Sequence, residues 1–540
     1  MKEIIGSYNE SLAVKCENGI FVGHKYEGGK EFLGIPFAKQ PVGSLRFRRP
    51  EKPEPSDKVY AADEFGPAPM QLFRSDELVG EDCLNLNIWV GSEVTEKAPV
   101  MVWIHGGGFV SEAARDPLYN LDELAKTAPD IVFVSIEYRV ELFGFIDLSE
   151  VPGGEGFEGS CNLGLLDQVE ALKWINRNIA GFGGDPEQVT IFGESAGGTS
   201  VSLLPIIEGT KGLFKRVIAE SGSMALTDNM DHMRKVTQNF LKASGCKTVQ
   251  ELQALDKKQI LEAHEKTLEL NFEEEIGYFN FAAFDGIVLP NTAEEGYAKW
   301  GEELKDIDLL MGSLADETLY YAWEEKDHDH YADVITRGIK KDMETVLPEE
   351  REAIEKFLAL DPGDIEEKEA TVTYYQDKPE TRMIVEFYND VFFRIGSNYM
   401  GDIHSDAGGK SYMYYMTYPR LNEAYGVMHA SELPFLMSKP YMNLDVDTAN
   451  SMPQEQWPED GYYTLDVELT SEIKKMWTNF ARTGDPSTEA HKWLPYSHQD
   501  KNYMVFGEEL HMEKNILQDR DELIKGWCHK YGIMGFRPLD

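Results

Sequence analysis

The stretch VTIFGESAGGTSVSLL, residues 189–204, places one serine between two glycines, where an apolar β-branched run meets a helix-like run. A buried strand followed by G-x-S-x-G and a helix is typical of a nucleophile elbow, which exposes the serine hydroxyl on a sharp, strained turn. Gly193 and Gly197 suit that turn because neighbouring backbones approach too closely there for a Cβ atom. The stretch therefore predicts a nucleophile at Ser195, and a glycine-rich turn that happens to contain a serine is the alternative.

Strand-like runs alternate with helix-like runs on both sides of this stretch. They are short and bounded by Gly or polar residues: PVMVWIH (99–105), DIVFVSIEY (130–138), VTIFG (189–193) and FKRVIAESG (214–222). Apolar, β-branched runs of this kind fit a parallel sheet that is buried on both faces. Helical spacing in LLDQVEALKWINRNI (165–179), with a stop at Gly181, completes the βαβ order of an α/β fold with a mostly parallel sheet.

Two longer regions differ from this alternation. From about 227–300 and 318–425, helical periodicity replaces the strand signals. Neither region is bounded by a Pro/Gly/Ser-rich linker, so we expect helical insertions that form a cap over the sheet within a single domain, residues 1–540. Near the start of the chain, Asn18-Gly19 between two apolar segments predicts a β-hairpin.

The charge and composition of the chain narrow its function classes. The formal net charge is −43, from 95 acidic and 52 basic residues, which would repel nucleic acid and anionic membranes. No run reaches the about 18 apolar residues that span a bilayer, and the first residues lack the apolar region of a signal peptide. The five cysteines show neither the C-x-x-C spacing of a zinc site nor the close spacing of a dense disulfide framework. We expect a cytoplasmic protein that uses no cofactor and no metal, with no nucleic acid or membrane partner.

A second glycine motif supports the elbow. An exposed serine needs a base and also donors that hold the negative charge formed on its substrate. WIHGGGF (103–109) follows a strand-like run, and its glycines let backbone N–H groups face a substrate oxygen with no side chain in the way. A glycine turn of this type, placed ahead of an elbow, is typical of the oxyanion hole in the α/β-hydrolase fold, where an acid and a histidine follow the serine in that order.

Blocks along nearly the whole chain resemble the type-B carboxylesterase family, which includes cholinesterases and, most similar to this chain, bacterial para-nitrobenzyl esterases. The blocks are FLGIPFAKQPVGSLRF (32–47), EDCLNLNIW (81–89), WIHGGGF (103–109), NLGLLDQVEALKWINRNIAGFGGDPEQVTIFGESAGG (162–198), MGSLADET (311–318), GVMHASELPF (426–435) and WTNFARTGDP (477–486). The resemblance implies an α/β-hydrolase fold, with a mostly parallel central sheet flanked by helices.

The resemblance also implies a catalytic triad. It carries over Ser195 as the nucleophile, Glu317 in MGSLADET as the acid and His429 in GVMHASELPF as the base. Glu317 lies 122 residues after Ser195, and His429 a further 112, so the three groups meet only through the fold. The oxyanion would be held by the backbone N–H groups of Gly107, Gly108 and Ala196.

The acid assignment has a rival next to it. Thr318 stands where the family usually has glycine, and Asp316 is an adjacent carboxylate. Asp316 therefore competes with Glu317 for His429, although the family pattern favours Glu317.

Other polar residues have competing interpretations. His404 in GDIHSD is the nearest rival of His429, but a helix end or loop there favours capping or solvent exposure. His105 is expected to shape the glycine turn rather than to transfer protons. DHDH at 327–330 is expected to be an acidic loop rather than a metal site.

The resemblance suggests supporting residues and a cellular setting. Glu194 and Ser221 stand where the family often keeps polar residues near the triad, as supports for His429 or Glu317 or as purely structural hydrogen-bonding groups. Secreted eukaryotic members pair the cysteine of EDCL with an upstream cysteine. Here Cys83 is present but Met70 stands where its partner would be, which favours a reducing, cytoplasmic and bacterial setting.

The expected function is that of a serine carboxylesterase, which hydrolyses uncharged, small-molecule carboxylic esters through an acyl-enzyme. The alternatives are an inactive, esterase-like binding module, or an amidase, carbamate hydrolase or lactonase with the same triad. FAAF (281–284) and LYYAW (319–323) are candidate walls of an apolar pocket, or residues that pack the cap against the sheet. The sequence does not determine the oligomeric state.

Overall fold

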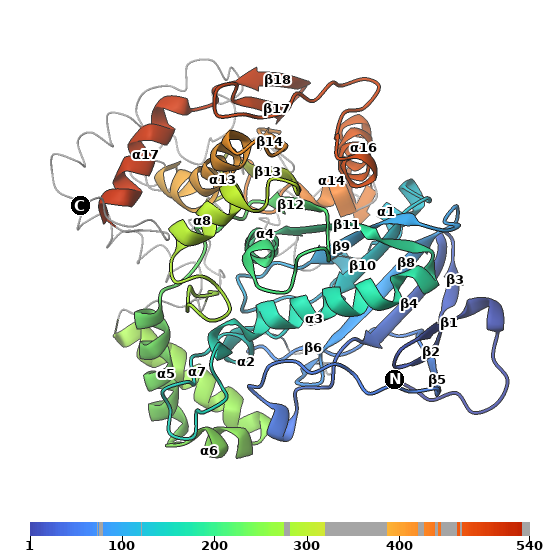
Figure 1. The fold of residues 1–540 in the computed structure, drawn as a ribbon, viewed down its shortest axis with the longest axis vertical. Coiled ribbons are helices and arrows are strands. Elements are labelled where there is room, and N and C mark those ends of the chain that lie inside the picture. Colours follow the sequence, from blue (N-terminus) through green and yellow to red (C-terminus); the bar gives the residue numbers. More distant parts are fainter. Residues whose placement is uncertain are drawn as a thin grey trace.

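The computed structural model describes residues 1–72, 74, 79–119, 121–274, 281–318, 386–418, 426–437, 441–443, 462–464 and 467–531. These residues contain an 11-stranded sheet (Figure 1). Its spatial order is β18 (Leu510–Lys514), β17 (Asn502–Phe506), β14 (Ser411–Met416), β13 (Asp308–Leu314), β12 (Arg216–Glu220), β11 (Gly184–Glu194), β9 (Ala98–Ile104), β10 (Val132–Ile136), β8 (Asn85–Gly91), β4 (Gly29–Pro36) and β3 (His24–Tyr26).

The central part of this sheet is parallel, from β10 across to β17, and antiparallel strands lie at both edges. Strands β10 and β12 are buried at every residue, as expected of strands covered on both faces. The four strand-like runs of the sequence form β9, β10, the last part of β11 and β12. The predicted α/β fold with a mostly parallel sheet is confirmed.

The helix predicted at 165–179 is α3 (Leu163–Asn178). Its stop differs from the prediction, because a short 3-10 turn, Ile179–Phe182, continues past Gly181. The chain reverses at Gly183, where φ is 89° and a side chain would be strained. Gly183, not Gly181, ends this helical segment.

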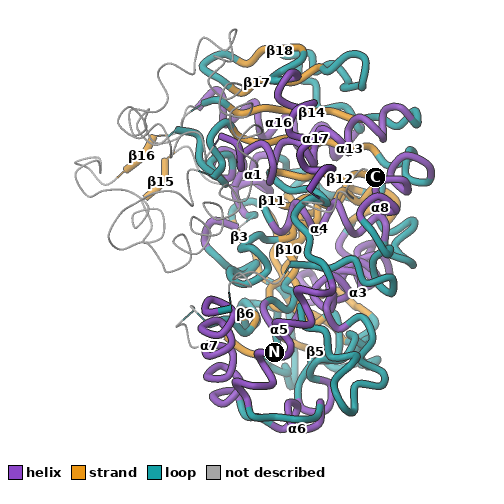
Figure 2. The backbone as a smooth tube through the Cα atoms, turned by 90° about the vertical axis from the view of Figure 1, so that its left-hand side faces the viewer, coloured by secondary structure: helices purple, strands orange, loops and turns teal. Residues whose placement is uncertain are grey.

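Helices cover both faces of the sheet. Helices α3, α8 (Ala293–Glu302) and α13 (Ile395–Asp406) lie on one face, and α1 (Asp122–Thr127) and α16 (Val467–Thr483) lie on the other (Figure 2). Helix α14 (Leu433–Met437) packs against α16. Helix α4 (Ala196–Leu203) packs on β9, β11 and β12. Helix α2 (Glu141–Gly144) packs on α3, and α17 (Gln518–Tyr531) packs on α13.

The first predicted insertion is helical. It contains α5 (Met230–Ser244), α6 (Val249–Ala254) and α7 (Lys257–Glu273), which lie to one side of the central strands in Figure 1. These helices bury a satellite core of their own with residues such as Phe47, Leu142 and Phe157. They therefore pack with α2 and neighbouring loops around a core that is separate from the core of the sheet.

The second predicted insertion, 318–425, is too long. Residues 319–385 and 419–425 lie outside the described residues. The described part holds the π-helix Asp390–Arg394 and α13, but at Ser411 the chain enters β14, a fully buried strand between β13 and β17. The aromatic residues and methionines of SYMYYM therefore belong to the sheet.

Smaller sheets lie outside the central one. The predicted hairpin is confirmed: β1 (Ala13–Cys16) pairs with β2 (Gly19–Val22), and Cys16 lies opposite Gly19. Strand β5 (Val59–Ala61) extends it. The two other pairs are β6 (Ala68–Pro69) with β7 (Val79–Gly80), and β15 (Tyr441–Asn443) with β16 (Tyr462–Thr464).

The carboxyl ends of four central strands lie side by side. Gly193 of β11 is opposite Ile104 of β9, and Glu220 of β12 is opposite both Glu194 of β11 and Gly312 of β13. Parallel strands direct these ends to one edge of the sheet, which is where open α/β sheets bind ligands. The residues that follow these strands therefore gather at one place.

Candidate active site

The elbow is as tight as its glycines predict. Ser195 has φ 56° and ψ −120°, a strained conformation for a non-glycine residue. A Cβ atom on Gly193 would lie 2.6 Å from the Ile104 carbonyl oxygen, and one on Gly197 would lie 2.0 Å from the same atom. The backbone N–H of Ser195 donates to the Glu220 carbonyl oxygen at 2.9 Å. Close backbone packing from β9 and β12 therefore holds the serine on its turn.

The glycine turn touches the elbow. A Cβ atom on Gly106 would lie 3.2 Å from Ser195 Cβ. Gly107 and Gly108 have φ of 80° and 61°, and both are partly exposed although the residues on either side are buried. Ala196 begins α4, so its N–H has no acceptor within the helix. The three predicted oxyanion donors thus belong to two turns that meet at Ser195.

His105 shapes the glycine turn from below. Its ring is fully buried and stacks on Tyr138, whose hydroxyl donates to the His105 carbonyl oxygen at 2.9 Å. Burial lowers the pKa of His105 to about 3, so its ring stays uncharged. The contacts of His105 are those of a residue that fixes the turn.

Glu317, and not Asp316, faces the histidine. His429 Nδ1 lies 2.5 Å from Glu317 Oε2, while the Leu314 N–H donates to Glu317 Oε1 at 2.8 Å. Asp316 Oδ2 accepts a hydrogen bond from the Val427 N–H at 3.0 Å. The neighbouring carboxylate therefore braces the loop that carries His429, which separates the roles of the two acids.

The other nitrogen of His429 is at the elbow. Nε2 lies 3.2 Å from Oε1 of Glu194, the residue directly before Ser195. The imidazole also packs on the Phe393 ring of the π-helix, with 4.7 Å between ring centroids. Burial is the main cause that raises the pKa of Glu194 well above its usual value, and nearby carboxyls, Glu432 first among them, add to it.

His404 is not at the site. It lies at the end of α13, as the sequence indicates, but it is fully buried rather than exposed. Its Nδ1 is 2.7 Å from Ser411 Oγ, and its ring packs on Trp300. Burial lowers the pKa of His404 to about 4, so this histidine is an uncharged part of the core.

Ser221 supports the site indirectly. Its backbone is strained, with φ 48°, and its hydroxyl donates to Glu432 Oε1 at 3.2 Å. The Ser221 hydroxyl therefore binds Glu432, which lies three residues after His429 in the chain. Sequence reasoning missed Glu432, Glu220 and Phe393; only Glu432 had a signal, three residues after His429 in GVMHASELPF.

The proposed apolar walls are partly described. Phe281 is partly exposed and lies beside Phe109, with ring centroids 6.3 Å apart. Ala283 is held by Asn162 through two hydrogen bonds, of 2.8 and 3.0 Å, so the rest of FAAF packs inside the fold. LYYAW and DHDH lie outside the described residues.

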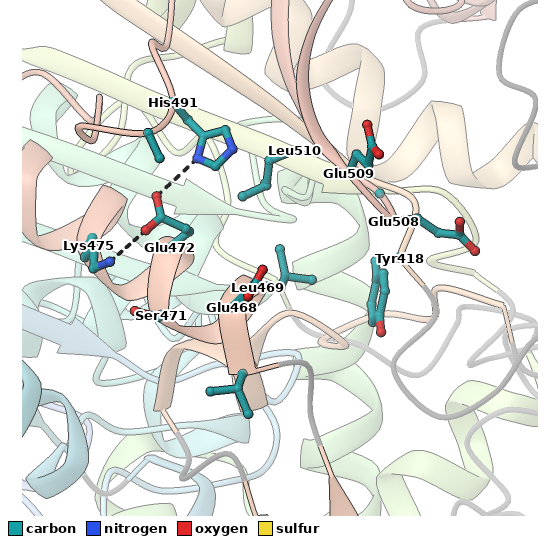
Figure 3. Close-up of a pocket in the computed structure, with 13 residues that line it drawn as sticks. Tyr418, Glu468, Leu469, Ser471, Glu472, Lys475, His491, Glu508, Glu509 and Leu510 are labelled. Atoms are coloured by element: carbon teal, nitrogen blue, oxygen red, sulfur yellow. Dashed lines mark hydrogen bonds and ion pairs between the residues drawn. The ribbon is translucent and has the colours of Figure 1, made fainter.

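A cavity of about 620 Å³ lies elsewhere, between the start of α16 and the β17–β18 hairpin (Figure 3). It holds a serine, an acid and a histidine, Ser471, Glu472 and His491. Glu472 already pairs with Lys475 at 2.7 Å and with His491 at 3.2 Å. Ser471 lies in a regular helix with no hydrogen bond to His491 in the described structure, so nothing there activates a nucleophile.

The described residues hold neither a cluster of metal ligands nor a membrane-spanning helix. No three His, Cys, Asp or Glu side chains cluster as metal ligands there. No helix in those ranges combines the length and the apolar character needed to cross a membrane.

Comparison with known proteins identifies the family of the chain. The sequence profile of the carboxylesterase family matches residues 10–524. The chain belongs to the carboxylesterase family. This carboxylesterase is 31% identical to the para-nitrobenzyl esterase of Bacillus subtilis (strain 168), over 93% of this chain and 96% of that one. It is a carboxylic ester hydrolase.

Solved structures of relatives have the same fold. A PNB esterase, 30% identical, superposes with a TM-score of 0.76 over 95% of this chain and 99% of its own. A carboxylesterase of Geobacillus stearothermophilus, 31% identical, gives 0.76 over the same shares. The expected α/β-hydrolase fold is therefore confirmed for this carboxylesterase.

Proposed function

We propose that this carboxylesterase hydrolyses uncharged carboxylic esters by acyl transfer to Ser195 and then to water. The 2.5 Å contact between His429 Nδ1 and Glu317 Oε2, beside the elbow, is the observation that carries the proposal. An imidazole held by a buried carboxylate is a base whose tautomer is fixed and whose positive charge is stabilised.

The first half of the reaction forms the acyl-enzyme. Ser195 Oγ attacks the ester carbonyl carbon while His429 Nε2 takes the hydroxyl proton, a contact that forms in the substrate complex. The backbone N–H groups of Gly107, Gly108 and Ala196 stabilise the oxyanion of the tetrahedral intermediate. When the intermediate collapses, the C–O bond to the alcohol breaks and His429 returns the proton to the leaving alcohol.

The second half repeats these steps with water. His429 takes a proton from a water molecule, which attacks the acyl carbonyl, and Ser195 leaves with that proton. The partly exposed Phe281 beside Phe109, and Phe393 on the His429 ring, supply apolar contacts for the acyl or alcohol group. These contacts support small, uncharged esters as the substrate class.

Hydrolysis of short and medium para-nitrophenyl acyl esters by wild type and Ser195→Ala tests the mechanism. We expect the variant to lose about 10⁴-fold or more of kcat/KM. Ser471→Ala is the matched control, since Ser471 has the same side chain in the other cavity, and it should keep full activity. A fluorophosphonate should label wild type and Ser471→Ala, but not Ser195→Ala.

The opposite result would favour one of the other functions. An inactive protein whose Ser195 resists the fluorophosphonate would be a binding module with an esterase-like fold. A protein that labels at Ser195, but cleaves amides, carbamates or lactones in preference to esters, would keep the triad and change the substrate class.

We also infer that the protein works in reducing surroundings, as a cytoplasmic protein would. All five cysteines are free, and Cys83 and Met70 line the same small buried cavity. Thiol titration of the protein, purified and denatured without reductant, should therefore find all five thiols. A smaller number would point to disulfides and an oxidising compartment.

A further inference from the structure

Two glutamates stand side by side in the sheet beneath the nucleophile. Glu194, at the end of β11, is the direct register partner of Glu220, at the end of β12. Register partners on parallel strands direct their side chains to the same face of the sheet. Like charges in such positions repel each other, so the pair is unfavourable if both carboxyls are ionised.

The row continues across the next two strands. Glu220 is opposite Gly312 of β13, which is opposite Tyr414 of β14. A Cβ atom on Gly312 would lie 2.2 Å from the Tyr414 ring, so that ring occupies the space that a side chain at 312 would need. The Tyr414 phenol therefore lies on the side of Glu220 away from Glu194. This row, from β11 to β14, contains no cationic side chain.

The hydrogen bonds of Glu220 satisfy half of its carboxyl group. Trp477 Nε1 donates to Oε1 at 2.7 Å, while the buried Oε2 accepts no hydrogen bond in the described structure. Glu220 is fully buried and forms no ion pair with Lys or Arg within the described ranges. An ionised Glu220 would thus be a buried charge with no cationic partner, which is costly.

The surroundings of Glu220 are acidic. Glu317 and Glu432 share the site, and Glu432 Oε1 accepts hydrogen bonds from Ser221 and Tyr414, at 3.2 Å each. Glu112 lies close enough to act on Glu194. The histidine among these groups is His429, whose nitrogens already face Glu317 and Glu194. Burial raises the pKa of Glu220 to about 8.

The backbone of Glu220 touches the nucleophile directly. Its carbonyl oxygen accepts the N–H of Ser195 at 2.9 Å. Two residues on, a Cβ atom at Gly222 would lie 2.5 Å from the Ser195 carbonyl oxygen. Any shift of this strand end would therefore move the elbow.

We propose that Glu220 is an uncharged carboxylic acid that positions the nucleophile, with its side chain lying between the Glu194 carboxyl and the Trp477 indole and its backbone holding Ser195. This inference rests on the proposed role of Ser195. It leaves Glu317 as the hydrogen-bond partner of His429, and it makes Glu220 a positioning residue, since it acts through the strand end.

The test compares the same substitution at two glutamates. Glu220→Gln replaces an uncharged acid by an uncharged amide of the same shape, so kcat/KM at pH 7 should stay within about fivefold of wild type. Glu317→Gln, the matched control, should lose about 10⁴-fold because it removes a charge that the reaction uses. A folded Glu220→Gln variant that loses about 30-fold or more would overturn the proposal.

Infrared difference spectra give a second readout that needs no turnover. When the pH rises from 7 to 9.5, wild type should lose the carbonyl band of a protonated carboxylic acid, and Glu220→Gln should lose less of it. If both proteins lose the band equally, the proposal is overturned. This result also decides the case in which kcat/KM of Glu220→Gln lies between about fivefold and about 30-fold below wild type. Activity that survives Ser195→Ala would instead overturn the proposed function, while the infrared result would still report the charge of Glu220.

Discussion

The two halves of the site are held together in different ways. The serine half, with Ser195 and the glycine turn, consists of two short motifs whose backbones pack closely against each other. A Cβ atom placed on Gly197 would lie 2.0 Å from the Ile104 carbonyl oxygen. The acid–base half consists of Glu317 and His429, 112 residues apart on two loops, which are joined by a side-chain hydrogen bond.

This difference teaches where each half is sensitive. The serine half depends on the absence of side-chain volume, so added atoms should damage it. The acid–base half depends on charge and on hydrogen-bond geometry, so substitutions that keep the shape but remove the charge should damage it most. The predictions below follow from this contrast.

The largest effect is expected from removing the charge of the acid–base half. Glu317→Gln keeps the shape of the side chain but cannot stabilise an imidazolium at 2.5 Å, so kcat/KM should fall about 10⁴-fold with little change in Tm. Asp316→Asn is the control, because its amide oxygen still accepts the Val427 N–H. A greater loss at Asp316 than at Glu317 would exchange the roles of the two acids.

The second largest effect is expected from adding one methyl group to the serine half. Alanine normally favours a helix over glycine, but in Gly197→Ala the new Cβ would meet the Ile104 carbonyl oxygen. We expect a loss of stability of about 3 kcal/mol, measured by thermal or urea unfolding, together with a fall in kcat.

Gly301→Ala is the matched control for this methyl group. Gly301 also lies in a helix, α8, but the nearest atom to its Cβ position is 3.6 Å away, so alanine there should stabilise the protein by up to about 1 kcal/mol. Similar effects of alanine at 197 and 301 would contradict the close packing of the elbow.

Between the two halves, Glu220 should make stability depend on pH. Its pKa of about 8, against 4.5 for an unperturbed carboxyl, means that between these pH values the unfolded chain releases a proton that the folded protein keeps. Wild-type stability should therefore fall as the pH rises through this window, relative to Glu220→Gln, by up to about 5 kcal/mol.

The measurement is Tm for both proteins at several pH values. The advantage of Glu220→Gln should grow from pH 5 to pH 8 and level off above, where the folded carboxyl also ionises. An advantage that stays constant or shrinks over this range would mean that Glu220 is ionised in the fold.

The smallest effect is expected at the apolar support of the base. Phe393→Leu removes the ring that packs on His429 at 4.7 Å, and kcat/KM should fall about fivefold through loss of imidazole orientation. Phe392→Leu, on the same π-helix, is the control and should change the rate less. Equal losses would show that the π-helix as a whole matters, rather than the ring on His429.

Much of the fold and the serine half could be predicted from the sequence. The strands, α3 and the elbow are specified by short runs of residues, and the close contacts of Gly193 and Gly197 agree with the prediction. The stop at Gly183 and the start of β14 at Ser411 were missed, because a local pattern does not show which glycine takes a left-handed conformation or which aromatic run joins the sheet.

The acid–base half could be predicted only in part. The family resemblance pointed to Glu317 and His429, but the sequence left Asp316 and His404 as rivals. The structure separates them, since Asp316 binds the Val427 N–H and His404 is buried against Trp300. Such choices depend on which loop lies opposite, and the loops come from distant parts of the chain.

By itself, the sequence determined the elements that depend on neighbours along the chain: the parallel-sheet strands, the glycine turn and the strained serine. Only the tertiary structure decided that Glu220 stands beside Glu194, that Ser221 binds Glu432 and that His429 Nε2 lies at the elbow. The physical reason is that sheet register and loop packing bring together side chains from separate segments of the chain, and no local pattern specifies which segments meet.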